Sequence, residues 1–116
     1  MDSISELNEK LLNFARERDW EQFHSPKNLA MALAAESGEL LEHFQWLTQQ
    51  QSYELPADKK AEVALEMAYI FIYLIRMGER LDIDLIAAVN RKIDINQNRY
   101  PRHKVKGDAR RAGEYD

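Results

Sequence analysis

The sequence predicts an all-α fold, a bundle-like arrangement of four helices in a single domain, as two observations indicate. Gly and Pro are scarce, four and three among 116 residues, which indicates few turns and long elements. Apolar residues recur at spacings of three and four along several segments, and no stretch alternates with period two. The absence of cysteine excludes a disulfide scaffold, a thiolate metal site and a cysteine nucleophile.

The first half of the chain predicts two helices. Ser3 or Ser5 can cap a first helix. Its apolar side chains recur every three or four residues, at Ile4, Leu7, Leu11 and Phe14. The pattern breaks in an aromatic stretch over residues 19–24. Ser25 followed by Pro26 is typical of a helix start, so we expect a second helix over residues 26–47.

Two more helices and a tail are expected in the second half. Residues 48–54 are polar and predict a loop, after which Pro56 starts a third helix that we expect to continue to Leu81. Asp82 can cap a fourth helix over residues 83–98. We expect a domain of residues 1–103, followed by a charged and mobile tail over residues 104–116.

Composition and charge favour a soluble cytoplasmic protein. The 45% hydrophobic and 31% charged content is ordinary for a globular domain. The longest apolar run covers thirteen residues, 63–75, and a bilayer span needs about 20. The first ten residues lack the apolar segment of a secretory signal. The net charge of −4 argues against non-specific nucleic-acid binding. We therefore expect neither a membrane nor a nucleic acid as a partner.

Carboxylates inside apolar helix segments are the most informative feature. Glu36 and Glu39 follow the apolar residues 29–35 and share a helix face. Glu66 is the one charge within residues 63–75, and Glu62 precedes it by one turn. An unpaired carboxylate in an apolar interior costs several kcal/mol, so a cation must compensate unless these acids lie on exposed helix edges.

A divalent ion is the compensation that the sequence favours. No Lys or Arg lies close in sequence to the acids of either segment. None occurs between Lys27 and Lys59, or between Lys60 and Arg76. If the second and third helices pack antiparallel, their acids can converge. Oxygen ligands alone suit Mg²⁺ or Mn²⁺. A di-iron site is set aside because it requires Glu-x-x-His on two helices.

The expected fourth helix carries a complementary face. Its residues at i, i+4, i+7 and i+8 are Lys92, Asn96, Arg99 and Tyr100. Cationic and hydrogen-bonding groups in one stripe suit phosphate oxygens. By itself the stripe fits better a solvated face on which Lys92 and Arg99 form surface ion pairs, which contribute little. Beside an acidic metal site, it indicates a nucleoside triphosphate or a similar phosphate ester.

The two tryptophans, Trp20 and Trp46, flank the second helix. Flat aromatic side chains at helix ends can stack on a nucleobase, although such residues are more often partly buried core residues. His24 and His43 are assigned no role.

These motifs resemble the MazG-like, all-α nucleoside triphosphate pyrophosphohydrolases. Glu36-x-x-Glu39 followed by Glu66 is similar to their E-x-x-E…E-x-x-D signature. Residues 18–24, 36–46 and 92–101 resemble the dCTP pyrophosphatase branch in particular. The resemblance covers the chain to about His103.

The resemblance implies an enzyme for nucleotide-pool house-cleaning that cleaves a dNTP, dCTP or a similar one, into monophosphate and pyrophosphate with Mg²⁺. It implies that Glu36, Glu39 and Glu66 bind the metal and are catalytic. Phosphate contacts are implied for the face of the fourth helix, and base contacts for Trp20 and Trp46. It also implies a homo-oligomer, a tetramer built as a dimer of dimers.

One position departs from the signature. The last acid should lie three residues after Glu66, where the sequence has Tyr69. A phenol is neutral at pH 7 and is a much poorer Mg²⁺ ligand than a carboxylate. Glu62 is a candidate substitute for part of that role. The alternative hypotheses are therefore a catalytically impaired nucleotide-binding homologue and, further away, a purely structural oligomerisation module.

Overall fold

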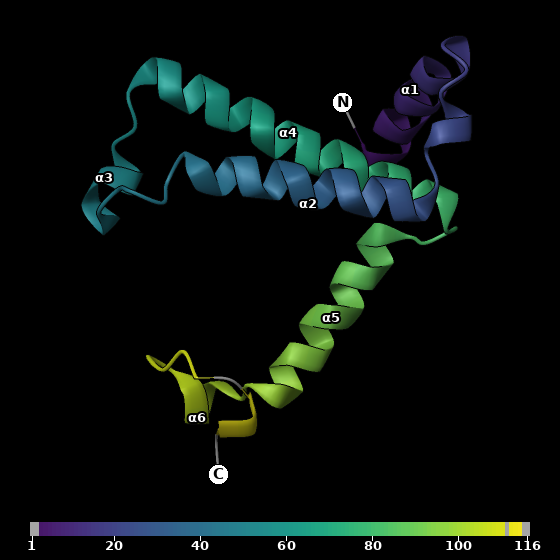
Figure 1. Ribbon diagram of the computed structural model, residues 1–116. Helices are drawn as coiled ribbons and strands as arrows, with labels where there is room; N and C mark the ends of the chain where they lie inside the picture. Colours follow the sequence, from purple (N-terminus) through teal and green to yellow (C-terminus); the bar gives the residue numbers. More distant parts are fainter. Residues whose placement is uncertain (1–2, 111, 115–116) are drawn as a thin grey trace. The chain divides into compact units, whose positions relative to one another are not determined.

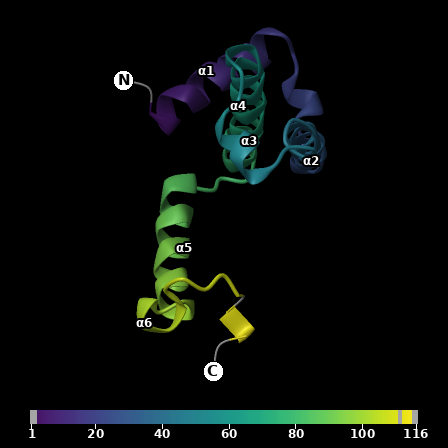
Figure 2. The ribbon, with the colours of Figure 1, turned by 90° about the vertical axis from the view of Figure 1, so that its left-hand side faces the viewer.

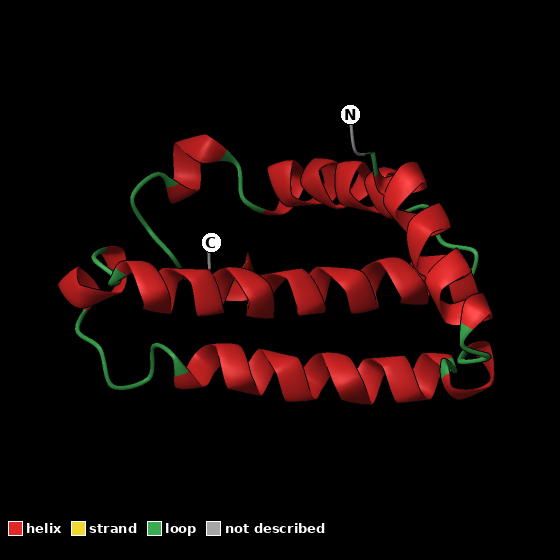
Figure 3. Cartoon of the chain, turned by 90° about the horizontal axis from the view of Figure 1, so that it is seen from above, coloured by secondary structure: helices red, strands yellow, loops and turns green. Residues whose placement is uncertain are grey.

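All regular secondary structure is helical in the part of the chain that the computed structural model describes, residues 3–110 and 112–114. No strand occurs in these two ranges (Figure 3), so the predicted all-α class is confirmed. The elements in chain order (Figure 1) are α1 (Ile4–Glu17), η1 (Glu21–Phe23), α2 (Pro26–Glu42), α3 (Gln49–Tyr53), α4 (Ala57–Arg80), α5 (Leu85–Arg99), α6 (Arg102–Val105) and η2 (Ala112–Glu114).

The chain divides into two compact units. The first extends to Ile83 and contains α1 to α4, and the second begins at Asp84 and contains α5, α6 and η2. None of the helices in the described ranges is both long and apolar enough to cross a membrane.

In the first unit, α2 and α4 lie side by side and run antiparallel, and α1 also packs on α4 (Figures 1 and 2). The buried apolar side chains come from all three helices: Ala15 from α1, Leu29 from α2, and Val63 and Ile75 from α4. Their burial holds the α2 face that carries Glu36 and Glu39 against α4.

The starts of α1 and α2 confirm the expected caps. The Ser3 Oγ accepts a hydrogen bond from the backbone N–H of Glu6 at 3.1 Å. The Ser25 Oγ accepts from the backbone N–H of Asn28 at the same distance, and Pro26 occupies the first turn of α2. Each hydroxyl satisfies a backbone donor that the helix itself leaves unpaired.

The region after α2 differs from the prediction. α2 ends at Glu42 rather than Leu47, and residues 43–46 form turns. The expected loop over residues 48–54 contains the short helix α3. A capping box explains it: the Thr48 Oγ1 accepts from the Gln51 backbone N–H at 3.1 Å, and the Gln51 Oε1 accepts from the Thr48 backbone N–H at 2.9 Å.

The predicted start of α4 is confirmed within one residue, whereas the cap of α5 is two residues later than expected. Asp84, not Asp82, caps α5, because its Oδ1 accepts from the backbone N–H of Ala87 at 3.0 Å. Asp82 has a φ of 54°, a left-handed conformation in the turn after α4 that Asp tolerates better than most residues. In the expected tail, the structure describes α6 and η2, while residues 111, 115 and 116 lie outside the described residues.

Candidate functional site

Antiparallel packing of α2 and α4 brings three carboxylates together. One oxygen from each of Glu36, Glu39 and Glu66 lies within 4.8 Å of the other two. Glu36 and Glu39 share one face of α2, since they are one turn apart. Glu66 reaches the same point from α4. Glu36 and Glu66 are half-buried and Glu39 is exposed, so the cluster is open to solvent on one side.

The cluster is electrostatically unbalanced. The Oε2 atoms of Glu36 and Glu66 are buried and have no hydrogen-bond partner among the described residues. Hydrogen bonding with the Glu66 side chain, followed by burial, raises the pKa of the Glu36 carboxyl, and a hydrogen bond with Glu39 opposes this change. Such a raised pKa indicates that the three acids cannot all carry a negative charge at no cost.

The donor set fits a hard divalent cation. The cluster offers oxygen ligands alone, two of them buried oxygens without a partner. Two of the bases of α4 pair with acids outside the cluster: Lys59 with Glu62 at 3.4 Å, and Arg76 with Glu79 at 3.3 Å. Carboxylate oxygens of this kind are the ligands that Mg²⁺ and Mn²⁺ prefer.

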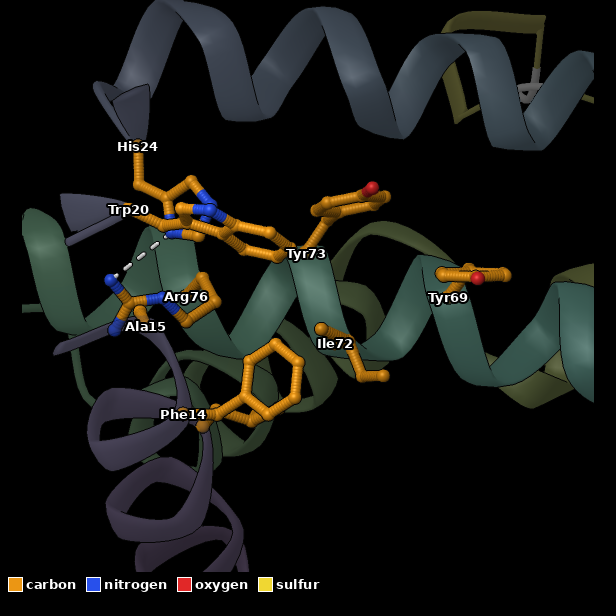
Figure 4. Close-up of a pocket in the computed structure, with 9 residues that line it drawn as sticks. Phe14, Ala15, Trp20, His24, Tyr69, Ile72, Tyr73 and Arg76 are labelled. Carbon is orange, nitrogen blue, oxygen red and sulfur yellow. Dashed lines mark hydrogen bonds between the residues drawn. The ribbon is translucent and has the colours of Figure 1, made fainter. Parts of the chain in front are cut away.

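A largely apolar cavity of about 280 Å³ lies further along α4 in the same unit. Its aromatic and polar lining residues (Figure 4) are Phe14, Trp20, His24, Tyr69, Tyr73 and Arg76. Trp20 packs edge to face on Phe14, with ring centroids 5.7 Å apart. Tyr69 stacks on Tyr73 at 6.3 Å and 17°. Flat walls of this kind suit a planar ligand.

One face of α4 connects the carboxylate cluster to the cavity. Glu66, Tyr69, Tyr73 and Arg76 are spaced by three, four and three residues, which places them on a single helix face. The rise of a helix separates the first from the last by about 15 Å along the axis. Burial, together with the charge of Glu36, raises the pKa of the Tyr73 phenol, so the cluster acts electrostatically on the cavity wall.

Hydrogen bonds from α4 fix the polar end of the cavity. The Arg80 Nε donates to the backbone oxygen of His24 at 3.0 Å, and its Nη2 donates to that of Glu21 at 3.2 Å. The Arg76 Nη2 lies 3.4 Å from the His24 Nδ1. Burial and the charges of Arg76 and Arg80 lower the pKa of His24. This lowered pKa favours the neutral imidazole.

Three comparisons place the chain among known proteins. The family model described as MazG-like matches residues 31–114. The dCTP pyrophosphatase 1 of Mus musculus is 45% identical over 83% of this chain, and that of Homo sapiens is 44% identical over 84%. This chain spans only 58% and 59% of the lengths of those relatives. A pyrophosphatase of Archaeoglobus fulgidus has a similar structure, with a TM-score of 0.81 and 37% identity, covering 87% of this chain and 94% of that one.

The chain belongs to the MazG-like family. The all-α fold expected from the resemblance is thereby confirmed as a MazG-like fold.

The other two candidate metal-site positions of this MazG-like chain lie outside the carboxylate cluster. Glu62 is exposed and pairs with Lys59. Tyr69 is 50% exposed and lines the cavity beside Tyr73. The structure therefore places the side chain of Tyr69, which stands where the family signature has its last acid, in the aromatic wall of the cavity.

The remaining candidates are distributed over both units. Trp20 lines the cavity, whereas Trp46 follows α2, is 86% exposed and is not among the described residues that line it. In the second unit, Lys92, Asn96 and Arg99 lie on α5, and the Arg99 guanidinium carbon lies 5.7 Å from the ring centroid of Tyr100, the C-terminal cap. Phosphate binding by this face stays a prediction.

Sequence reasoning missed the cavity residues other than Trp20 and Tyr69. Tyr73 and Ile72 belong to the apolar run and look like ordinary core residues in the sequence. Arg76 could have been singled out from the sequence, because it is the first basic residue after that apolar run. His24 closes the aromatic stretch before α2 and lies 52 positions from Arg76, so only the fold pairs the two.

Proposed function

We propose that this MazG-like chain is a nucleoside triphosphate pyrophosphohydrolase that uses Mg²⁺, or Mn²⁺ in its place. The observation that supports it most is the cluster of three carboxylates with buried, unpartnered oxygens on the same α4 face as an aromatic cavity. The relatives named dCTP pyrophosphatase 1 favour dCTP or a similar dNTP as substrate. The products are the monophosphate and pyrophosphate, which fits a role in nucleotide-pool house-cleaning.

In this proposal, the carboxylates of the cluster bind the metal and assist the attacking water. Glu36, Glu39 and Glu66 would hold the ion, which when bound supplies positive charge that polarises phosphate oxygens. A carboxylate of the cluster accepts a proton from the water that attacks the α-phosphorus, and the bond from that phosphorus to the bridging oxygen breaks.

The remaining proposed site residues bind the substrate. The face of α5, with Lys92, Asn96, Arg99 and the cap Tyr100, holds the phosphate oxygens and neutralises charge on the leaving pyrophosphate. Trp20 stacks on the base, with Trp46 as a second aromatic contact.

Tyr69 favours a second candidate function, nucleotide binding with impaired turnover. Its phenol lies in the wall of the cavity and lacks the negative charge of the acid in the family signature. Three carboxylates rather than four then hold the ion, which lowers metal affinity and rate.

The exposed apolar surface supports a homo-oligomer, and we propose a dimer or a dimer of dimers that works in the cytoplasm. On α4 alone, the large exposed apolar side chains are Leu65, Met67, Tyr69, Phe71 and Leu74. A monomer seldom leaves so many apolar groups of one helix in contact with water. We expect light scattering after gel filtration to give two or four times the chain mass of 13.6 kDa. A single chain mass would contradict the proposal.

Pyrophosphate release tests the proposed function directly. We expect the chain to release pyrophosphate from dCTP with Mg²⁺, and to lose this activity when EDTA removes the ion. The four dNTPs are compared at equal concentration to establish base preference. A non-hydrolysing binder would release none, yet dCTP with Mg²⁺ at 100 times its Kd would stabilise it by about 2.7 kcal/mol. A structural module would show neither effect.

A further inference from the structure

Arg76 is a buried charge with too few partners. Its side chain is 2% exposed, and its Nε is buried without a hydrogen-bond acceptor in the part of the chain that the structure describes. Among the described residues, the guanidinium has one acidic partner, Glu79, at 3.3 Å, and one further contact, the His24 Nδ1, at 3.4 Å. A guanidinium carries five N–H donors. A buried donor without an acceptor costs free energy. A further acceptor beside Arg76 would therefore be stabilising.

The open space beside Arg76 is the aromatic cavity, which its side chain lines together with His24 and Trp20. Figure 4 shows Arg76 and His24 at one end of the cavity and Tyr69 at the other. The lining residues there contribute no carboxylate. An occupant therefore meets flat hydrophobic walls along most of its surface and hydrogen-bond donors at one end.

The neighbouring His24 adds a second donor. A guanidinium has no acceptor, so the Arg76 contact requires the Nδ1 of neutral His24 to accept, which leaves the proton on Nε2. Arg80 holds the His24 backbone in place through its 3.0 Å hydrogen bond. Arg76 and His24 thus place their polar groups together at one end of an otherwise apolar cavity.

We propose that Arg76, supported by His24, binds an acceptor atom on the edge of a nucleobase held in this cavity, and that it is a specificity-determining residue. This inference rests on the proposed function, since it takes the cavity ligand to be the base of the nucleotide. Cytosine and thymine both present a ring carbonyl oxygen that can accept from a guanidinium. Stacking on the aromatic walls binds any flat ring, whereas the Arg76 donors select rings that turn an acceptor, such as the carbonyl oxygen of cytosine or thymine, toward the polar end of the cavity.

A matched set of nucleotides isolates this hydrogen bond. The probes are dCMP, dTMP and the deoxynucleoside monophosphate of 2,4-difluorotoluene, which keeps the shape of thymine but replaces its carbonyl oxygens by fluorine. Titration calorimetry compares the wild-type chain with Arg76→Met, which keeps an unbranched apolar side chain of similar length. We expect the variant to bind dCMP and dTMP about tenfold or more weakly, and the difluorotoluene nucleotide within about twofold of wild type.

Two further variants separate recognition from support of the fold. Glu79→Gln removes the ionic partner of Arg76 but keeps the guanidinium, and we expect it to bind dCMP within about twofold of wild type. Arg76→Lys keeps the charge without the planar fork, and we expect an intermediate loss of dCMP affinity. It also provides a second test of the hydrogen bond if circular dichroism shows that Arg76→Met does not fold.

The outcomes distinguish this inference from the proposed function. Equal loss for all three nucleotides, no binding of dCMP by the wild type, or the same loss in Glu79→Gln would overturn the role of Arg76. Absence of pyrophosphate release from every dNTP by the wild type would overturn the proposed function. In that case, a loss of affinity in Arg76→Met for dCMP and dTMP, but not for the difluorotoluene nucleotide, would still support base recognition by Arg76.

Discussion

Replacing Glu66 by Gln is expected to lower the rate of pyrophosphate release by about 100-fold or more. The change keeps the size of the side chain but removes a charge from the cluster in which three carboxylate oxygens lie within 4.8 Å of one another. Loss of a group that merely orients a metal ligand costs about 10–100-fold, so loss of a ligand should cost at least as much. Glu36→Gln and Glu39→Gln are expected to behave alike.

Stability provides the second readout of this prediction. Without metal, Glu36→Gln or Glu66→Gln should melt at the same temperature as wild type or higher, because each relieves repulsion among the acids. Addition of Mg²⁺ should raise the melting temperature of the wild type more than that of either variant. The matched control is Glu9→Gln, an exposed acid of α1 outside the cluster, which should retain full activity. Full activity in any of the three cluster variants would remove the proposed metal site.

Replacing Tyr69 by Asp is expected to increase Mg²⁺ affinity by about tenfold or more. The new carboxylate would lie one helical turn from Glu66 on the same face of α4, and a tenfold gain corresponds to about 1.4 kcal/mol. The attraction between one added negative charge and a divalent ion next to it is large enough to supply this free energy. The side chain of Tyr69 is 50% exposed, so removal of its ring leaves no buried cavity. Calorimetric titration with Mg²⁺ measures the affinity.

Activity in the same variant decides between the two candidate functions. A large increase in pyrophosphate release by Tyr69→Asp would mean that the present chain is impaired. Unchanged affinity and rate would mean that three carboxylates suffice and that Tyr69 serves the cavity wall. Tyr69→Phe is the control, because it keeps the ring that stacks on Tyr73 and removes only the hydroxyl. It should bind Mg²⁺ as the wild type does.

Much of the local structure follows from short-range chemistry and was therefore predictable. Ser3, Ser25 and Pro26 mark helix starts because their effects act within one turn. The same reasoning failed where two local signals competed. Residues 48–54 are polar enough for a loop, yet the reciprocal hydrogen bonds of Thr48 and Gln51 form α3. Asp82 and Asp84 are equally good caps in sequence, and the turn after α4 selects Asp84.

The sequence by itself determined the helical class and singled out Glu36, Glu39 and Glu66, because a carboxylate in an apolar helix segment is costly wherever the chain folds. Only the tertiary structure decided that these acids meet, since the antiparallel packing of α2 on α4 sets the distance between residues 30 positions apart. It also decided that Tyr69 joins an aromatic wall and that His24 meets Arg76. The stack of Tyr69 on Tyr73 lies within one helix, whereas the contact of His24 with Arg76 and the cavity shared with Phe14 and Trp20 join distant segments of the chain. Helical periodicity describes only one segment at a time.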